Sequence, residues 1–227
     1  MRLGRVLVNR STGVLFVSSI CLGLLAACSD STGSSGNEPG RVAFVPYGFP
    51  QGVSPDGKTV MFQSLGGATG AEVYFYDVAT RQTSLVTTAG SNSNDIANGL
   101  SNDGVIASAY GDPVQAGIWS QANGWQVITS PYSTGCDPFE GGAWDVSADG
   151  SVVVGHFYEG CANQAFISTG GVTTMLARLG TNDFDSIPSS RASVVSNDGT
   201  TAAGYSTLGA LDRVPAVWHA DGSGFLV

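Results

Sequence analysis

Carboxylates and aromatic side chains gather in the segments that separate the strand-like runs of this 227-residue chain. Loops on a rigid scaffold are where binding residues concentrate, because a loop can vary without disturbing the core. Acids beside aromatic rings suit a sugar, a cation or a basic protein segment. The sequence therefore predicts a ligand, either protein or glycan, at these residues: Asp95, Asp112, Tyr132, Asp137, Glu140, Glu159, Asp183, Asp185 and Asp212, with Phe139 and Phe184 beside them.

One carboxylate lies apart from these loops. Asp145 follows Trp144 in an expected strand, at a position where related segments of the chain carry Gly52, Gly99 and Val194. Glycoside hydrolysis requires two carboxyl groups at a set separation, and the sequence assigns no partner to Asp145. Asp145 is thus the single catalytic candidate. An envelope enzyme acting on polysaccharide, a glycoside hydrolase or a lyase, is the alternative function.

Two segments offer oxygen ligands of the kind that calcium prefers. They are residues 92–95 (NSND) and residues 182–185 (NDFD). Neither has the ligand spacing of an EF-hand loop, and Asp/Asn clusters are ordinary loop chemistry. We assign no metal site and no cofactor, and calcium is the ion to test.

The amino-terminal segment has the layout of a secretory signal. Arg2, Arg5 and Arg10 precede an apolar run from Val14 to Leu25, which is too short to favour a membrane-spanning helix. Residues 29–40 (SDSTGSSGNEPG) have the composition of a flexible tether and cannot build a core. We therefore expect residues 1–27 to be removed and residues 28–40 to be a linker.

Leu25-Ala26-Ala27-Cys28 resembles a bacterial lipobox. The resemblance implies cleavage before Cys28, lipidation of its thiol, and attachment to the membrane by the lipid alone. Ser29 follows the cysteine, and in this respect the chain is similar to Gram-negative lipoproteins exported to the outer membrane. The resemblance thus predicts a lipid-anchored protein of the bacterial envelope, with the outer membrane as its destination.

The charge of the chain argues against a nucleic-acid partner. The formal charge is −9, and removal of residues 1–27 takes away three arginines and no carboxylate, which leaves −12. An acidic surface repels phosphate backbones and anionic lipid head groups. It favours cationic partners.

Two cysteines remain once Cys21 is removed and Cys28 is lipidated, namely Cys136 and Cys161. An even pair in an exported domain predicts a disulfide. The expected strands place the pair at two adjacent strand ends, which a disulfide can bridge. A redox or metal role is disfavoured because the spacing is too long for a redox motif and no third soft ligand is near.

A short motif of serine, any residue, aspartate and glycine recurs along the chain. Its glycines are Gly57, Gly104, Gly150 and Gly199, which lie 47, 46 and 49 residues apart. Self-similarity at this period marks a repeat architecture, and the length suits one four-stranded propeller blade. Glycine supplies the positive φ of a tight turn, and aspartate bonds nearby backbone amides. The motif is therefore expected to be a fold element and not a catalytic or metal site.

Short β-branched and aromatic runs broken by Gly, Asp, Asn and Ser predict an all-β fold. We expect a β-propeller-like domain over residues 41–227, in which four repeats of about 47 residues each form a four-stranded antiparallel blade. The expected units span about 41–88, 89–130, 131–178 and 179–227. Either Arg41–Val45 pairs with the last unit and closes the ring, or the chain is part of a longer propeller.

Two stretches make the resemblance more specific. Gly150–Phe157 (GSVVVGHF), Ala165-Phe166 and Gly170-Gly171-Val172 are similar to the HAF-type extracellular repeat, as are Gly204-Tyr205-Ser206 and Ala216-Val217-Trp218. Ser54–Val60 (SPDGKTV) resembles the propeller repeat of Tol-Pal periplasmic proteins. These resemblances imply a fold and carry no catalytic residue to this chain. The expected function is therefore a binding or scaffolding module that uses the acidic, aromatic-containing loop face.

Overall fold

The computed structural model describes residues 48–67, 70–89, 96–133, 136–180, 188–209 and 212–227. The predicted signal peptide, Cys28 with its tether, and the Arg41–Val45 segment lie outside the described residues. In the described part of the chain no helix is long and apolar enough to cross a membrane.

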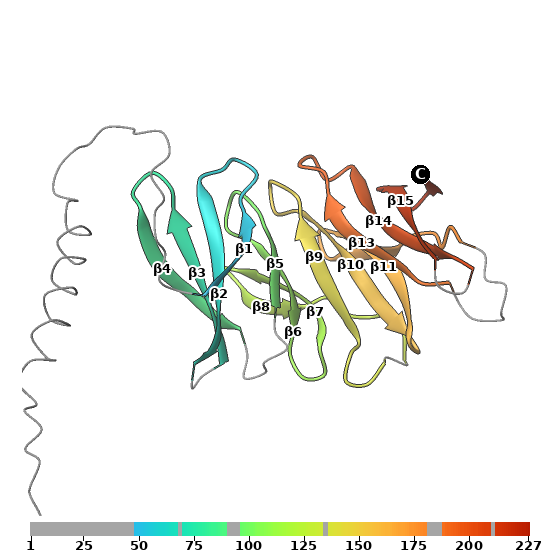
Figure 1. The fold of residues 1–227 in the computed structure, drawn as a ribbon, viewed down its shortest axis with the longest axis horizontal. Helices are drawn as coiled ribbons and strands as arrows, with labels where there is room; N and C mark the ends of the chain where they lie inside the picture. Colours follow the sequence, from blue (N-terminus) through green and yellow to red (C-terminus); the bar gives the residue numbers. More distant parts are fainter. Residues whose placement is uncertain (1–47, 68–69, 90–95, 134–135, 181–187, 210–211) are drawn as a thin grey trace, which may run out of the picture. The chain divides into compact units, whose positions relative to one another are not determined.

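The described chain folds into four antiparallel sheets of four strands each (Figure 1). The first contains β1 (Phe49–Val53), β2 (Thr59–Gly67), β3 (Gly70–Asp77) and β4 (Gln82–Ala89). The second contains β5 (Ile96–Leu100), β6 (Ile106–Tyr110), β7 (Gln115–Ser120) and β8 (Gly124–Val127). The third contains β9 (Gly141–Val146), β10 (Val152–Glu159), β11 (Ala162–Thr169) and β12 (Val172–Met175). The fourth contains β13 (Ser190–Val195), β14 (Thr201–Leu208), β15 (Asp212–His219) and β16 (Gly224–Leu226).

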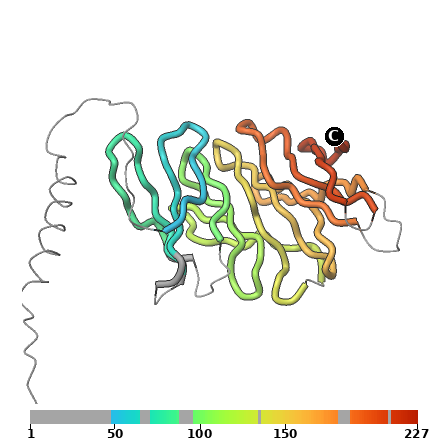
Figure 2. The backbone as a smooth tube through the Cα atoms, in the orientation of Figure 1, coloured from blue at the N-terminus to red at the C-terminus, as the bar shows by residue number. Residues whose placement is uncertain are grey.

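Each sheet is a simple meander whose strands pair in sequence order. The first strands of successive sheets contact each other, β1 with β5, β5 with β9 and β9 with β13. Figure 2 traces the chain from the first sheet to the fourth, each sheet lying beside the one before it. The all-β fold with four repeated antiparallel sheets, predicted from the motif spacing, is confirmed.

The recurring motif forms the turn between the first and second strands of every sheet. In the third sheet the Ser147 hydroxyl donates to Asp149 at 2.6 Å and accepts the amide of Val152 at 3.0 Å. The turn glycine, Gly150, has a φ of +75°, a conformation that favours glycine. The Ser147 hydroxyl, and then the Ser151 amide and hydroxyl, donate to the Asp149 carboxylate and lower its pKa to about 2. The prediction that the motif is a fold element is confirmed.

Hydrogen bonds also run from turn to turn across the sheets. The Asp56 amide donates to the Asn102 side chain at 2.9 Å. The Asn102 amide donates to the Ala148 carbonyl at 2.9 Å, and the Ala148 amide donates to the Asn197 carbonyl at 3.1 Å. Successive repeats are thus held in one register by the turn that their sequences share.

Three apolar cores fill the spaces between neighbouring sheets. Met61, Val73 and Ile106 belong to the first core, Phe157 and Phe166 to the second. The third core, between the third and fourth sheets, is the following set: Val152, Val154, Ala165, Ile167, Leu176, Ala192, Ala202, Ala216 and Trp218. Each interior sheet therefore buries both faces, one against the sheet before it and one against the sheet after it.

A β-bulge interrupts the first strand of every sheet at the same place in the repeat. The residues that the pairing skips are Gln51, Asn98, Trp144 and Ser193. A bulge re-aims the side chain that it carries. Asn98 accordingly reaches the next sheet, where its amide nitrogen donates to the Ala143 carbonyl at 2.8 Å.

Candidate functional site

Two loops that belong to different repeats pair with each other. The Val114 amide donates to the Pro138 carbonyl at 2.8 Å, and the Glu140 amide donates to the Val114 carbonyl at 2.7 Å. The Gln115 side chain adds a 2.6 Å hydrogen bond to the Glu140 carboxylate. The second and third sheets are therefore joined at the end opposite to the recurring turns, where the sequence predicts the ligand-binding residues.

This paired-loop surface brings four of the predicted residues together, and they are Asp112, Asp137, Phe139 and Glu140. Asp112 and Asp137 are exposed, and Glu140 is half-buried. The Phe139 ring is 40% exposed although it is apolar. An exposed aromatic ring among carboxylates is the combination that the sequence predicted for a binding face.

The predicted disulfide is present and supports this surface. Cys136 and Cys161 are bonded, with a Cα–Cα distance of 4.7 Å. Cys136 lies in the loop that precedes β9, and Cys161 lies in the turn between β10 and β11. The bridge therefore ties the loop that carries Asp137 and Phe139 to the third sheet.

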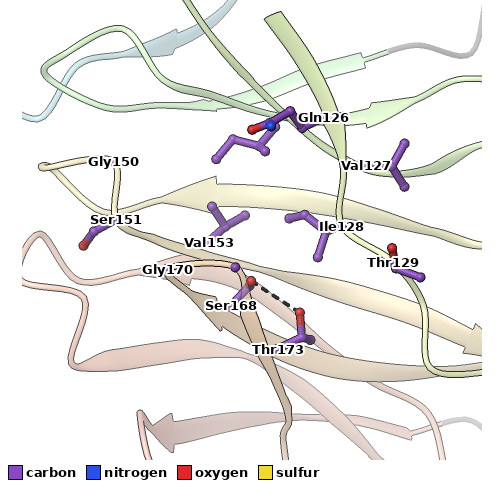
Figure 3. A pocket seen from close by; sticks show the side chains of 12 residues that line it. Gln126, Val127, Ile128, Thr129, Gly150, Ser151, Val153, Ser168, Gly170 and Thr173 are labelled. Atoms are coloured by element: carbon purple, nitrogen blue, oxygen red, sulfur yellow. Dashed lines mark hydrogen bonds between the residues drawn. The ribbon is translucent and has the colours of Figure 1, made fainter. Parts of the chain in front are cut away.

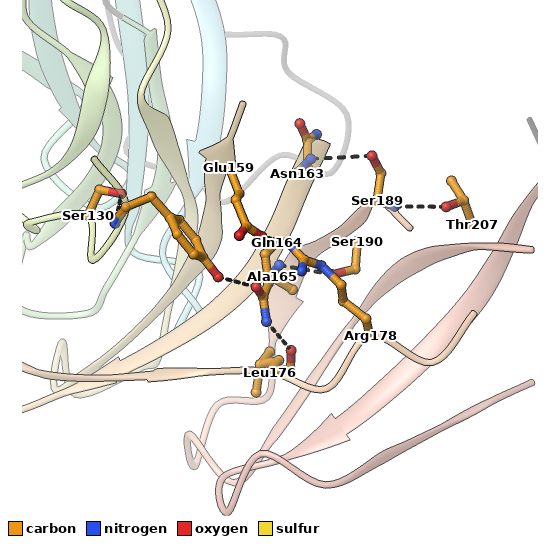
Figure 4. Close-up of polar contacts among 11 residues, drawn as sticks. Ser130, Glu159, Asn163, Gln164, Ala165, Leu176, Arg178, Ser189, Ser190 and Thr207 are labelled. Carbon is orange, nitrogen blue, oxygen red and sulfur yellow. Dashed lines mark hydrogen bonds and ion pairs between the residues drawn. The ribbon is translucent and has the colours of Figure 1, made fainter. Parts of the chain in front are cut away.

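Two further predicted residues have protein partners in the third sheet. The Glu159 carboxylate forms a 2.7 Å ion pair with Arg178, and the Tyr132 hydroxyl donates to the Gln164 side chain. Burial raises the pKa of the Tyr132 hydroxyl. Gln164 also donates to the Leu176 carbonyl at 3.1 Å, as Figure 4 shows. Glu159 and Tyr132 are thereby held in place.

A pocket of about 280 Å³ lies between the paired-loop surface and Tyr132. Its lining includes Gln115 and Glu140 from the paired loops, and Tyr132 and Phe157 from the adjoining segment and strand. A carboxylate and two aromatic rings around one cavity suit a cationic side chain. Of the remaining predicted residues, Asp212 is exposed at the start of β15, and Asp95, Asp183, Asp185 and Phe184 are outside the described residues.

A groove of about 590 Å³ lies between the second and third sheets, nearer the recurring turns (Figure 3). Its lining contains no charged side chain and includes Gln126, Ser151, Ser168 and Thr173. The Thr173 hydroxyl donates to Ser168 at 3.3 Å. None of the residues predicted to bind a ligand reaches this groove, which is neutral and rich in hydroxyls.

Asp145 bridges the third and fourth sheets. Its carboxylate accepts the Val195 amide at 2.8 Å and the Val146 amide at 2.9 Å. Burial raises the pKa of the carboxyl, and these two amides oppose that shift. Both oxygens are thus occupied by backbone donors, which favours a role in holding adjacent first strands together.

Replacing Asp145 tests this structural role. Asp145→Ala leaves the Val195 amide without its acceptor, so the free energy of unfolding in urea should fall by about 1–3 kcal/mol. Gln121→Ala, at an exposed turn position between β7 and β8, should change it by less than about 0.5 kcal/mol. Equal stability of the two variants would show that the Asp145 bridge contributes nothing.

A cluster of aromatic and cationic side chains surrounds the bulge at Trp144. The indole donates to Nδ1 of His156 at 2.9 Å, and the Arg191 guanidinium lies 4.4 Å from the centre of the Trp144 ring. Arg191 also lies over Tyr205 at 5.2 Å, and Arg213 lies over the same ring at 4.5 Å. The sequence did not predict this cluster, because its members come from two repeats and Trp144 reaches them only through the bulge.

His156 should give the protein an acid-sensitive stability. Burial, and then the nearby Arg191, lower the pKa of the His156 imidazole from 6.5 to about 4. The unfolded chain therefore binds this proton first, so stability is fully present above pH 6.5 and is lost as the pH falls towards 4. The melting temperature of the wild type should drop more steeply between pH 7 and pH 4.5 than that of His156→Gln, which does not titrate. His219→Gln, at an exposed position, is the control and should follow the wild type.

The structure does not test the calcium hypothesis at the segments that motivated it. Residues 92–95 and 182–185 lie outside the described residues. Within the described ranges, no group of three or more His, Cys, Asp or Glu side chains is arranged to hold a metal ion.

Comparison with known proteins identifies the fold. No protein-family model matches the chain, and no curated protein matches it significantly. Among solved structures, a putative TolB from Agrobacterium tumefaciens superposes with a TM-score of 0.51 at 15% identity, over 77% of this chain and 62% of that one. Puromycin hydrolase gives 0.51 at 14% identity, over 77% and 27%. TolB from Acinetobacter baumannii gives 0.48 at 23% identity, over 77% and 41%.

This chain thus spans less than two thirds of the length of each of these proteins. The described part has the fold of TolB-like β-propeller proteins, as the resemblance of Ser54–Val60 predicted. The HAF-type repeat and the lipoprotein signal stay predictions.

Proposed function

We propose that this protein is a binding or scaffolding module of the bacterial cell envelope, and that its partner is a basic protein segment. The partner contacts the paired-loop surface, with a lysine or arginine side chain entering the pocket beside Glu140 and Tyr132. The observation that carries this proposal is the pocket that joins Glu140 to Tyr132 and Phe157. A cation there is attracted both by the carboxylate and by the faces of the rings.

The design of the surface supports recognition of a macromolecule. Asp112 and Asp137 extend the negative charge outside the pocket, and Phe139 offers an exposed ring between them. Charges at the rim of an interface steer association, whereas a buried aromatic group supplies affinity. The disulfide and the hydrogen bonds at Val114 fix the loops before a partner arrives, which lowers the entropy cost of binding.

Envelope localisation belongs to the same proposal. It rests on the signal-like residues 1–27, on the lipobox-like Cys28 and on the likeness to TolB proteins in fold. In this arrangement the lipid anchors the amino terminus, and the tether that the composition of residues 29–40 predicts lets the domain reach a partner at a distance from the membrane. Mass spectrometry of the mature protein tests the anchor: a diacylglyceryl group on Cys28 supports it, and an intact residue 1–27 segment contradicts it.

A photo-crosslinking experiment tests the binding surface. A photoreactive phenylalanine analogue at position 139 should crosslink one specific partner in the native envelope. The crosslink should disappear in the Asp112→Asn/Asp137→Asn/Glu140→Gln variant, and it should persist in Asp103→Asn, which removes an exposed carboxylate near the recurring turn. The yield should also fall as salt is raised, because rim charges are screened. An undiminished crosslink in the triple variant would contradict the proposal.

A further inference from the structure

Among the described residues, no other sheet covers one broad face of the first sheet. Along β2, Met61 and Gln63 are buried against the second sheet. Val60 and Phe62 alternate with them along the strand and so point to the other side. Tyr76 on β3 pairs with Val60 and shares that side. On the same face Val53 is 58% exposed and Leu85 is 55% exposed. The uncovered face is therefore apolar and aromatic.

Within the described ranges, the fourth sheet likewise has one face that no other sheet covers, and it is the complementary face. Ala202, Ala216 and Trp218 are buried against the third sheet, so the residues between them point away from it. Across the four strands Val194, Ala203, Val217 and Phe225 are register partners and form one apolar row. Val194 is 54% exposed and Phe225 is 51% exposed.

The repeat identifies what each of these two faces is built to contact. Val217 occupies the position that Phe75, Ile118 and Ile167 hold in the first three sheets, where each packs towards the following sheet. Tyr76 occupies the position that Trp119 and Trp218 hold, where each packs towards the preceding sheet. The uncovered face of the fourth sheet thus corresponds to the face with which the other sheets contact the sheet after them. The uncovered face of the first sheet corresponds to the face with which the other sheets contact the sheet before them.

The hydrogen bonds between turns end in the same complementary way. The residue after the motif serine donates its backbone amide to the carbonyl of the equivalent residue in the following repeat. Asn102 donates in this way to Ala148, and Ala148 donates to Asn197. The last such amide, that of Asn197, has no acceptor among the described residues. The first such residue is Pro55, which has no amide hydrogen but keeps its carbonyl acceptor. A donor is left over at the fourth sheet and an acceptor at the first.

The turn glycines show the same gap. A side chain built at Gly104, Gly150 or Gly199 would meet Phe75, Val105 or Val152 of the preceding repeat. A side chain built at Gly57 meets nothing within 4 Å. Among the described residues, the first turn therefore has no neighbour of the kind that each later turn has.

Charge distinguishes these two faces from a generic apolar surface. Glu72 lies on the uncovered side of β3, where its carboxylate accepts a hydrogen bond from the Tyr74 hydroxyl at 2.6 Å. By alternation along β15, Arg213 shares the side of Val217, where its guanidinium lies 4.5 Å from the centre of the Tyr205 ring. Neither Arg213 nor Arg191 forms an ion pair within the described residues. Glu72 pairs with Ser64 and Arg213 with Thr207, so both lie near the hairpin end remote from the recurring turn. Docking the two faces would bring opposite charges to the same level.

We propose that the fourth sheet of one copy of this chain docks on the first sheet of a second copy, and so repeats the interface found between sheets within the chain. The contact is heterologous, because two different faces meet. Two copies close into a ring if the rotation per sheet permits it, and an open chain of copies forms if it does not. This assembly leaves the paired-loop surface free, so the binding function proposed above and the self-association fail or hold separately.

Light scattering on the purified protein, over a range of concentrations, tests the proposal first. The expected result is a mass of two or more copies. Arg213→Glu should weaken the association at least tenfold, and adding Glu72→Arg to the same chain should restore it, because the swapped charges again attract. Rescue by the second change distinguishes lost complementarity from a misfolded variant. A single-copy mass at all concentrations overturns the proposal, whichever partner or further segment covers these faces.

A directed disulfide tests the geometry. In a background with Cys21 and Cys28 changed to serine, one sample carries Asn197→Cys and another carries Pro55→Cys. When the two samples are mixed and mildly oxidised, a disulfide between Cys at 197 of one copy and Cys at 55 of another should give covalent dimers. Thr80→Cys, at an exposed turn between β3 and β4, replaces Pro55→Cys in the control and should give at least tenfold fewer dimers. Equal yields with Pro55→Cys and Thr80→Cys contradict the proposed docking.

Discussion

Trp218→Ala should lower the free energy of unfolding by about 4 kcal/mol, the loss typical of removing a buried large aromatic side chain. Trp218 is fully buried in the core between the third and fourth sheets. Its indole nitrogen donates to the Ala177 carbonyl at 2.9 Å, so the alanine variant loses both packing and a hydrogen bond. Chemical denaturation followed by fluorescence of the other tryptophans, or by circular dichroism, measures the loss.

Two variants separate the contributions at this position. Trp218→Phe keeps most of the ring volume and gives up the hydrogen bond to Ala177, so it should cost about 1–3 kcal/mol. Val172→Ala, at a position 71% exposed, should stay within about 0.5 kcal/mol of the wild type. A Trp218→Ala variant as stable as Val172→Ala would mean that the third and fourth sheets are not packed as described.

Removing the disulfide should have a comparable effect. Cys136 and Cys161 are 25 positions apart, and closing a loop of that length restricts the unfolded chain by about 3.5 kcal/mol on the chain-entropy model. The Cys136→Ala/Cys161→Ala variant should lose about that much unfolding free energy, measured in urea without reductant. It should also weaken partner binding, because Asp137 and Phe139 lie in the loop that the bridge holds.

Reduction supplies the matching control. Reductant should destabilise the wild type to the level of the double variant and leave the double variant unchanged. If reductant changed neither protein, the bridge would contribute nothing. If reductant destabilised both proteins equally, its effect would have a cause other than the disulfide.

The recurring turn explains why the fold could be predicted from sequence. Serine, aspartate and glycine each have one local task there, and every bond that fixes the turn lies within five residues. The position of the apolar residue before each turn then sets which face of the strand enters the core. The disulfide was predictable for a related reason, because the antiparallel meander brings the ends of β9 and β10 together.

The rest of the site depends on contacts between distant segments. No local pattern indicates that the Val114 loop pairs with the Pro138–Glu140 loop, since the two belong to different repeats. The bulges carry no common residue, for Gln51, Asn98, Trp144 and Ser193 are all neutral but differ in size and in chemical type. The stacking of Arg191 on Trp144 follows from one of these bulges and was therefore missed.

Asp145 is a position at which the third repeat differs from the others, and the structure shows one consequence of that difference. It departs from the glycine and valine of the other repeats, and that departure marked it as a catalytic candidate. In the structure the departure has a structural role, since a side chain with an acceptor is needed to bond the Val195 amide from the neighbouring sheet; the catalytic role of Asp145 stays a prediction. A residue that differs between repeats can thus serve a contact between two particular sheets and need not be catalytic.

The four repeats are equivalent sheets that are stacked in register through their shared turns. Scalar couplings across hydrogen bonds, measured by NMR, test it at single bonds. The structure predicts one coupling from the Asn102 amide to the Ala148 carbonyl and another from the Ala148 amide to the Asn197 carbonyl, with slow exchange of both amides. Absence of both couplings, together with exchange as fast as in an exposed loop, would contradict the stacking.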